Sequence, residues 1–323
     1  MLYILGAIVF TFIFRTTLPY HYTLLEKSFS DTLMRIKKPS SKLFRKGVLD
    51  LLDEYRMALA LLIGLNILLG VFNFIDITTV WYNYEWQGEM LRSFVHRGIY
   101  VLIIAVLCSI FIILYYFRNN LNFFSKSKWL RISAYIWLAQ NIILLISVAI
   151  RNSIYIEYFN LAYKRIGVYF FLFLCLLGII SVIWKLVTYK SKYWLQRINA
   201  MSVFIVLHVI TFFDWDKIIA SHNYKNFDHA FFHYDFMQSL APSAWSEMPI
   251  DDNTIRSLEL MQSEAMLPVR ERHTYMSATT YQQIINQKQE KFCNEYSTRH
   301  CLEWNYADSK TYQNLQQKFS ISP

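Results

Sequence analysis

Long, uninterrupted apolar runs limit what this chain can fold into more than any other feature of its sequence. Four runs of about 20 residues hold almost no charged side chain: Met57–Ile75, Gly98–Phe117, Leu130–Ile150 and Ile166–Val187. A helix rises about 1.5 Å per residue, so about 20 apolar residues cross the roughly 30 Å hydrocarbon core of a bilayer. The runs therefore predict an all-α, multi-pass membrane protein with at least four transmembrane helices.

Two shorter apolar runs, Leu2–Phe14 and Ala200–Phe213, raise the expected number of transmembrane helices to about six. The first run lacks the basic leading region and the cleavage site of a signal peptide, so we expect it to stay in the protein. The second run is short for a span, but the flanking Ile198 and Trp215 favour a tilted span or one in a thin membrane. We therefore expect residues 1–213 to form a transmembrane helix bundle.

The remaining residues, 214–323, have a lower density of apolar side chains, and we expect a smaller, soluble and mostly helical tail. Pro242, Pro249 and Pro268 punctuate it, because proline cannot continue a helix. Four tail segments have a composition compatible with helices: His229–Leu240, Thr254–Met266, Thr279–His300 and Ser309–Phe319.

The net charge of +9 is unevenly distributed along the chain. Residues 1–213 carry 22 Lys and Arg against 9 Asp and Glu, whereas residues 214–323 carry 10 against 14. The positive charge thus falls in short loops between apolar runs, which is typical of membrane proteins and not of a nucleic-acid-binding surface. We expect the lipid bilayer as a partner, an envelope protein partner of unknown identity, and no nucleic acid.

The basic residues also predict which way the helices cross the membrane, since cytoplasmic loops are enriched in Lys and Arg. Three alternate connections, Arg15–Arg56, Arg118–Arg131 and Lys185–Arg197, together hold 17 basic residues. The connections between them hold five. This asymmetry predicts a multi-pass protein of the cell membrane with its N-terminus and its tail on the extracytoplasmic side.

Polar residues within the predicted spans are costly to bury in lipid. They are Asn66, Gln140, Asn141 and His208. We interpret them as groups that form hydrogen bonds between helices, with a polar translocation path as the alternative. The predicted spans contain no Asp or Glu to carry a proton, which disfavours a proton-coupled transporter.

Further polar and aromatic residues gather in the connections expected on the extracytoplasmic side. Arg151, Lys164 and Arg165 suit phosphate groups, because Arg and Lys donate charge-assisted hydrogen bonds to phosphate oxygens. The aromatic stretch Trp81–Trp86 predicts an interfacial belt, with a sugar- or lipid-binding platform as the alternative.

A metal site and a disulfide are the remaining possibilities in the tail. His229 and His233 are four residues apart, as in some zinc sites, but Ala230 stands where the H-E-x-x-H motif has its Glu. We therefore expect no metal and no other cofactor. Cys293 and Cys301 would lie about 12 Å apart on one continuous helix, so a disulfide between them requires a helix break.

Four stretches in a fixed order resemble one protein family. They are V-H-R-G-I-Y-V-L-I at Val95–Ile103, Y-F-N-L-A-Y-K-R-I-G-V-Y at Tyr158–Tyr169, D-W-D-K-I-I-A-S-H-N at Asp214–Asn223, and E-W-N at Glu303–Asn305. This set is similar to the bacterial multi-pass membrane proteins grouped as a domain of unknown function (the 4153/4173 group). The resemblance implies a polytopic membrane protein and no particular activity. Such proteins often have further helices upstream, so this chain could be a shortened member.

The resemblance also marks the positions where a family site would lie. Six of them make up a candidate outer-face polar cluster: His96, Lys164, Arg165, Asp214, Asp216 and Asn223. Tyr163 is a seventh such position. The sequence departs from the family pattern at Arg97, where an acidic residue is typical, and at Tyr158–Ala162.

Two functions from different classes fit these features. The chain lacks P-loop, nucleophile-elbow, kinase and dinucleotide-binding motifs, which favours a non-enzymatic envelope sensor, scaffold or assembly factor with no assigned catalytic residue. The alternative is a membrane enzyme or carrier that handles a lipid-linked or phosphate-bearing substrate at the outer face. Convergence of the outer connections around a pocket would help to distinguish them.

Overall fold

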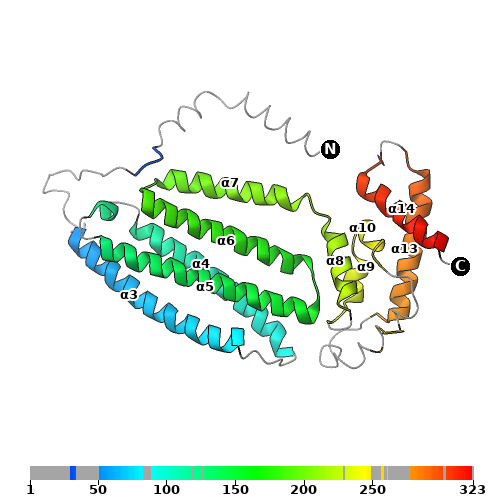
Figure 1. Cartoon of the computed structure of the whole chain (residues 1–323), viewed down its shortest axis with the longest axis horizontal. Helices are drawn as coiled ribbons and strands as arrows, with labels where there is room; N and C mark the ends of the chain where they lie inside the picture. The colour runs from blue at the N-terminus through cyan, green and yellow to red at the C-terminus, as the bar shows by residue number, and fades with distance from the viewer. Residues whose placement is uncertain are drawn as a thin grey trace. The chain divides into compact units, whose positions relative to one another are not determined.

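The computed structural model describes the chain in several ranges (Figure 1). They are residues 30–33, 51–82, 89–117, 120–124, 127–227, 230–248, 256–257, 260, 276–300 and 303–321. Within these ranges every regular element is a helix, and one isolated antiparallel bridge pairs Thr32 with Lys190. The predicted all-α class is therefore confirmed. Leu2–Phe14 and most of Thr254–Met266 lie outside the described residues.

The apolar runs form long helices. Their bounds are α3 Leu51–Asp76, α4 Glu89–Tyr116, α5 Lys128–Phe159, α6 Tyr163–Thr188 and α7 Lys192–Ile210. A short 3-10 helix, η3, covers Asn120–Phe123. α3 continues directly into a π-helix, η2, at Ile77–Tyr82, where the hydroxyls of Thr78 and Thr79 donate to backbone carbonyls of the preceding turn.

Four stretches of the described chain are long and apolar enough to cross a membrane. They are Leu52–Trp81, Lys128–Phe159, Tyr163–Thr188 and Lys192–Ile210, and Tyr100–Tyr116 is a shorter apolar helix. The predicted span Ala200–Phe213 has different bounds, because its helix begins at Lys192 and ends at Ile210. The prediction began too late because it treated Lys192 and Arg197 as loop, although long basic side chains can extend from a helix to the interface.

Large apolar side chains on these helices point away from the protein. Leu68 and Phe74 on α3 are each 70% exposed, and Phe111 on α4 is 69% exposed. Extensive apolar exposure of this kind is unfavourable in water and suits contact with lipid tails. The outward apolar faces therefore agree with a membrane protein.

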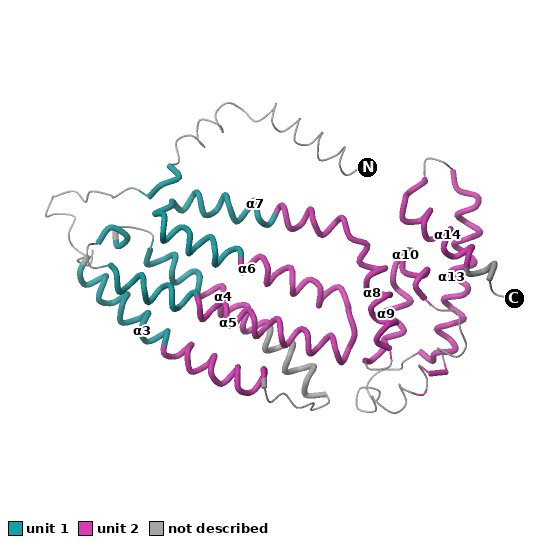
Figure 2. Tube along the Cα trace, viewed as in Figure 1, with its two compact units in different colours: residues 1–66, 109–138, 177–203 teal, residues 67–108, 139–176, 204–323 magenta. Residues whose placement is uncertain are grey.

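The chain divides into two compact units, drawn in different colours in Figure 2. Unit 1 comprises residues 1–66, 109–138 and 177–203, and unit 2 comprises residues 67–108, 139–176 and 204–323. The division cuts through the apolar helices, and residues 214–323, which we call the tail, belong to unit 2. The predicted domain boundary at residue 213 stays a prediction.

Polar contacts connect the helices within unit 1. The Asn66 side chain of α3 donates to the carbonyl of Ser133 on α5 at 3.0 Å, as predicted for an interhelical group. Asn199 of α7 donates to the hydroxyl of Ser181 on α6 at 3.0 Å. Lys185 is buried, and its ammonium donates to the carbonyl of Phe117, just after the end of α4.

The tail is built of helices around an apolar core. Its helices are α8 Trp215–Lys225, α9 Tyr234–Gln238, α10 Pro242–Trp245, α13 Ala278–Thr298 and α14 Tyr306–Ile321. Ile219, Phe232, Met237 and Tyr281 lie at the centre of the core. α13 and α14 match two of the predicted helices closely.

The predicted helix His229–Leu240 is largely wrong. The described helix in this segment covers only Tyr234–Gln238, and Phe231 and Phe232 precede it as two consecutive buried side chains in a non-helical stretch. Consecutive side chains point to opposite sides of an extended chain, so this conformation buries both rings against different neighbours. His233 then caps α9 by accepting a hydrogen bond from the backbone of Phe236.

Candidate functional site

The short turn between α5 and α6 is held by an arginine from the start of α6. Asn160 in this turn has a φ of 65°, a left-handed conformation that Asn tolerates better than most residues. The Arg165 guanidinium donates to the carbonyls of Phe159, at 2.7 Å, and Asn160, and lies over the ring of Tyr155. Arg165 thus satisfies carbonyls that α5 leaves open at its C-terminal end.

A buried asparagine of the tail joins this turn to α8. Asn223 is only 3% exposed, and its side-chain amide pairs with both backbone groups of Leu161. The Leu161 N–H donates to Asn223 Oδ1 at 2.8 Å, and Asn223 Nδ2 donates to the Leu161 carbonyl at 3.0 Å. Nearby, the Phe231 N–H donates to the Tyr158 carbonyl at 2.8 Å, and the Asn160 amide donates to the Phe231 carbonyl at 3.2 Å.

Two aspartates at the start of α8 extend the same set of contacts. Asp216 Oδ1 accepts hydrogen bonds from the Tyr163 hydroxyl and from the Ala241 N–H. Asp214 caps α8 by accepting from the Lys217 N–H at 3.1 Å, and it accepts from the Ser243 hydroxyl at 3.0 Å. What we call the turn–tail junction comprises Tyr158–Arg165 and the tail residues Asp214, Asp216, Asn223 and Phe231.

Most of the candidate outer-face cluster therefore meets in the turn–tail junction. Arg165, Asp214, Asp216 and Asn223 lie there, and each makes contacts that hold one part of the backbone to another. Lys164 is exposed on α6, and no hydrogen bond or ion pair links it to the described residues. His96 lies in α4, and its side chain is outside the described residues.

A buried ion pair that the sequence did not predict lies earlier on α5, before its C-terminal end. Asp76, the last residue of α3, is 5% exposed and accepts hydrogen bonds from Arg151 and Ser147. Trp81 of the π-helix donates to the Ser147 hydroxyl at 3.3 Å. Asp76, Trp81, Ser147 and Arg151 form what we call the ion-pair cluster.

The ion-pair cluster corrects one prediction. Asp76 lies inside the candidate span Leu52–Trp81, so the expectation that no Asp or Glu falls within a span is wrong. The prediction ended this helix at Ile75 because an acid followed, although the sequence after Asp76 is again apolar. A carboxylate between apolar stretches needs a buried partner, and this rule could have pointed to a basic residue such as Arg151.

The other predicted intramembrane polar residues have varied surroundings. The Gln140 carbonyl accepts a hydrogen bond from the Asn73 side chain of α3 at 3.2 Å, and Asn141 beside it is fully buried. His208 Nδ1 lies 2.9 Å from the Phe204 carbonyl of its own helix, and the side chain is exposed. Asn66 and the Gln140 backbone thus take part in contacts between helices, whereas the hydrogen bond of His208 is within one helix.

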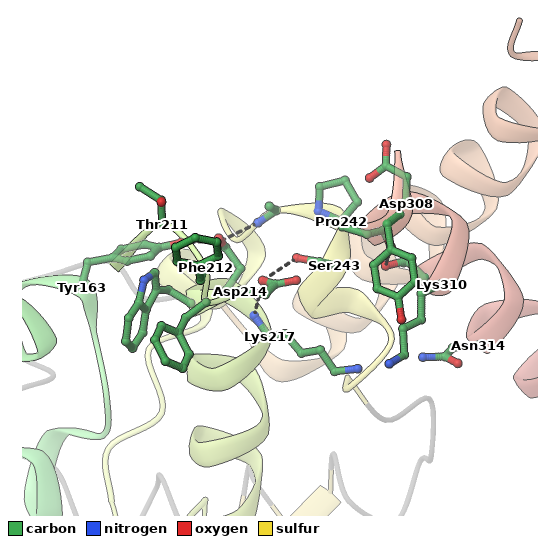
Figure 3. Close-up of a pocket in the computed structure, with 17 residues that line it drawn as sticks. Tyr163, Thr211, Phe212, Asp214, Lys217, Pro242, Ser243, Asp308, Lys310 and Asn314 are labelled. Carbon is green, nitrogen blue, oxygen red and sulfur yellow. Dashed lines mark hydrogen bonds between the residues drawn. The ribbon is translucent and has the colours of Figure 1, made fainter. Parts of the chain in front are cut away.

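A pocket of about 640 Å³ opens beside the turn–tail junction (Figure 3). Tyr163 lines it, together with residues of the connection from α7 to α8, of the first turn of α8, and of α10 and α14. Acidic and basic groups line it together, namely Asp214, Asp216, Asp308, Lys217 and Lys310. The described residues contain no group of three or more His, Cys, Asp or Glu that could hold a metal ion. His229 lies outside them.

Helices long and apolar enough to cross a membrane, with large apolar side chains that face outward, define this protein as a helical integral membrane protein. Residues 1–248 match the family described as "Domain of unknown function (DUF4153)", and the chain belongs to this family. No curated protein and no solved structure matches the chain. The matched range contains the whole turn–tail junction and ends before α13 and α14, so α14 contributes to the pocket from outside it.

Proposed function

We propose that the protein is a non-enzymatic scaffold, sensor or assembly factor of the bacterial cell envelope, with its tail on the extracytoplasmic side. The observation that carries this proposal is the structural role of the polar candidates. Asn223 and Arg165 are engaged with backbone groups, and Asp214 and Asp216 each hold two hydrogen-bond donors of the protein. Residues used in this way join the tail to the membrane helices.

The C-terminal part of α5 links the ion-pair cluster to the turn–tail junction. Arg151 pairs with Asp76, and the next residue, Asn152, donates to the carbonyl of Arg165 at 3.0 Å. One helical turn later, Tyr155 lies beneath the Arg165 guanidinium. A change in the buried ion pair would therefore move the segment of helix that holds the turn, which is the arrangement that a sensor needs.

Hydrogen exchange of the full-length protein in lipid nanodiscs tests this coupling. Asp76→Asn is expected to speed exchange in α8 and in the turn, because it weakens the ion pair that fixes α5. Asn199→Ala is the matched control, since it removes an interhelical asparagine of unit 1. Unchanged exchange in α8 of the Asp76→Asn protein would contradict the sensor role.

Labelling of Cys293 tests the proposed side of the tail. In a protein that lacks the other three cysteines, an impermeant maleimide is expected to react with Cys293 in intact cells. Burial raises the pKa of this thiol, so the reaction should be slower than for an exposed cysteine. Reaction only after lysis would place the tail in the cytoplasm.

A second candidate function is a membrane enzyme or carrier for a lipid-linked or phosphate-bearing substrate. The pocket favours it, although Arg151 and Arg165, two of the three cations expected to bind phosphate, are engaged elsewhere. Turnover of a lipid or glycan substrate by the purified protein, abolished by Asp214→Asn, would establish this function and contradict the first.

A further inference from the structure

We propose that the pocket beside the turn–tail junction binds the zwitterionic headgroup of a membrane phospholipid, one that carries a phosphate and a primary ammonium. This inference deepens the proposed functions by naming a ligand class. It rests on their membrane setting, but it requires neither turnover nor coupling of the tail to the helices.

The position of the pocket along the chain places it at headgroup depth. Tyr163 is the first residue of one candidate span, and Thr211 directly follows Ile210, the last residue of another. The headgroup layer of a bilayer is about 5–8 Å thick on each side, which is only a few residues of helix. Residues at the ends of two spans therefore line a pocket where headgroups lie.

Exposed aromatic side chains at the same place support this depth. Phe212 is 74% exposed and Phe213 is 50% exposed, and both line the pocket directly after the end of α7. Phenylalanine rings are apolar throughout, so rings this exposed suit contact with acyl chains better than contact with water. These two rings would lie against the glycerol and upper acyl region of a bound lipid.

One part of the pocket suits the phosphate. Lys217, Lys310 and Asn314 line it, and the close-up shows their side chains on the same side of the pocket (Figure 3). Lys310 is exposed and forms no ion pair within the described part of the chain. Lys217 lies 3.0 Å from Glu247, so its charge is partly balanced already. Two ammonium groups and an amide give several donors to phosphate oxygens.

The opposite charge is provided by the two aspartates of the turn–tail junction. Among the described residues, all hydrogen bonds to Asp214 and Asp216 use Oδ1, so Oδ2 of each can accept from a ligand. The third acid, Asp308, already pairs with Arg299 at 2.6 Å. A ligand with only negative charge would be repelled by these two carboxylates, whereas a zwitterion satisfies both ends of the pocket.

The carboxylates also select the kind of ammonium group. A primary ammonium donates three hydrogen bonds, whereas a trimethylammonium donates none to a carboxylate. Trimethylammonium groups prefer open aromatic faces. Tyr163 and Trp215 line the pocket, but the Trp215 ring packs against Phe170 and Phe213 and the Tyr163 ring packs against Phe236, so other side chains cover part of each ring. The pocket therefore fits an ethanolamine headgroup better than a choline headgroup.

Lipid retention by the full-length protein tests the proposal. The protein is taken from nanodiscs of equal parts phosphatidylethanolamine, phosphatidylcholine and phosphatidylglycerol, and the retained lipids are counted by native mass spectrometry. Phosphatidylethanolamine should exceed each of the other lipids by about tenfold. Lys310→Gln, which removes a donor to the phosphate, should lower the amount of phosphatidylethanolamine retained, and Lys291→Gln, an exposed lysine on α13 away from the pocket, should leave it unchanged.

A second pair of variants and a soluble probe complete the test. Asn314→Ala should weaken retention, whereas Gln313→Ala, on an exposed position beside it, should not. Equal retention of phosphatidylglycerol or phosphatidylcholine, or a Lys310→Gln protein that behaves like wild type, would overturn the proposal. Displacement of the lipid by free phosphoethanolamine at equal concentration would show a soluble ligand and overturn the assignment to a membrane lipid. Hydrogen exchange in α8 is measured separately, so failure here leaves the coupling proposal intact.

Discussion

Leu68 and Phe74 of α3 are largely exposed, whereas Ile219 and Met237 of the tail are fully buried. Besides apolar side chains, the apolar helices bury polar groups such as Asn141 and the Asp76–Arg151 pair. Lipid tails are as apolar as leucine, so burying a leucine between helices gains little there, and polar contacts hold helices in register. Burying apolar side chains, as the tail core does, gains most where the alternative is contact with water. The two regions thus differ in which kind of side chain contributes most when it is buried.

Removal of one charge from the ion-pair cluster should produce the largest effect. Asp76→Ala leaves Arg151 buried without its carboxylate, which is expected to cost about 4 kcal/mol of stability. Thermal unfolding in detergent measures the loss. The Asp76→Ala, Arg151→Met double variant should be closer to wild type, because no unpaired charge remains. A single variant as stable as wild type would show that the pair does not hold α3 and α5 together.

The same substitution in the two regions should have different effects. Met237→Ala leaves a cavity in the tail core and should cost about 3 kcal/mol. Met201→Ala, on the exposed face of α7, should change stability by less than about 0.5 kcal/mol in nanodiscs. Chemical unfolding followed by tryptophan fluorescence compares them. Equal losses would mean that α7 is packed against protein at Met201.

Loss of the amide that joins the tail to the turn should have a smaller effect. Asn223→Ala leaves the buried N–H and C=O of Leu161 without their partner, at a cost of about 2 kcal/mol. Asn294→Ala on an exposed position of α13 is the control. Hydrogen exchange should show faster exchange of the Leu161 amide only in the first variant. Faster exchange of the Leu161 amide in Asn294→Ala and not in Asn223→Ala would show that the Asn223–Leu161 contact does not hold the tail to the turn.

Alkaline pH should weaken the tail without affecting it near neutrality. Tyr224 and Tyr281 lie in the tail core with their hydroxyl oxygens 2.5 Å apart, and burial raises the pKa of both phenols above the ordinary value of 10.0. The unfolded phenols ionise first as pH rises, so stability is constant below about pH 10 and falls above it. Unfolding between pH 8 and 11 measures this. Tyr224→Phe should flatten the fall, and Tyr306→Phe, on an exposed tyrosine, should not.

Local signals in the sequence predicted much of the helical part. The runs Leu130–Ile150 and Ile166–Val187 lie within α5 and α6, because hydropathy along a single helix decides whether it can enter lipid. Hydropathy along one helix gave the wrong result at Asp76, which was predicted to end the helix because it is acidic. Its partner Arg151 is 75 residues away in the sequence. A buried charge is stabilised by a distant residue, and no window of sequence contains both.

For the candidate site, the family resemblance indicated residues and not the contacts that they make. Asp214, Asp216 and Asn223 were chosen because of a family resemblance, and they do lie together. That Asn223 pairs with Leu161, 62 residues earlier, depends on how α8 packs against the turn, which composition does not encode. Sequence also gave no signal that Tyr306 and Lys310 of α14 would line the same pocket.

The π-helix η2 at Ile77–Tyr82 determines how the residues after α3 are rotated about the helix axis. A π-helix holds more residues per turn than an α-helix, so it turns the following residues by a different angle around the helix axis. An α-helix of the same length would turn each of the steps from Asp76 to Trp81 further around the axis, and so would rotate Trp81 away from Ser147. The hydrogen-bonding pattern of this short stretch therefore determines which side chains it presents to α5.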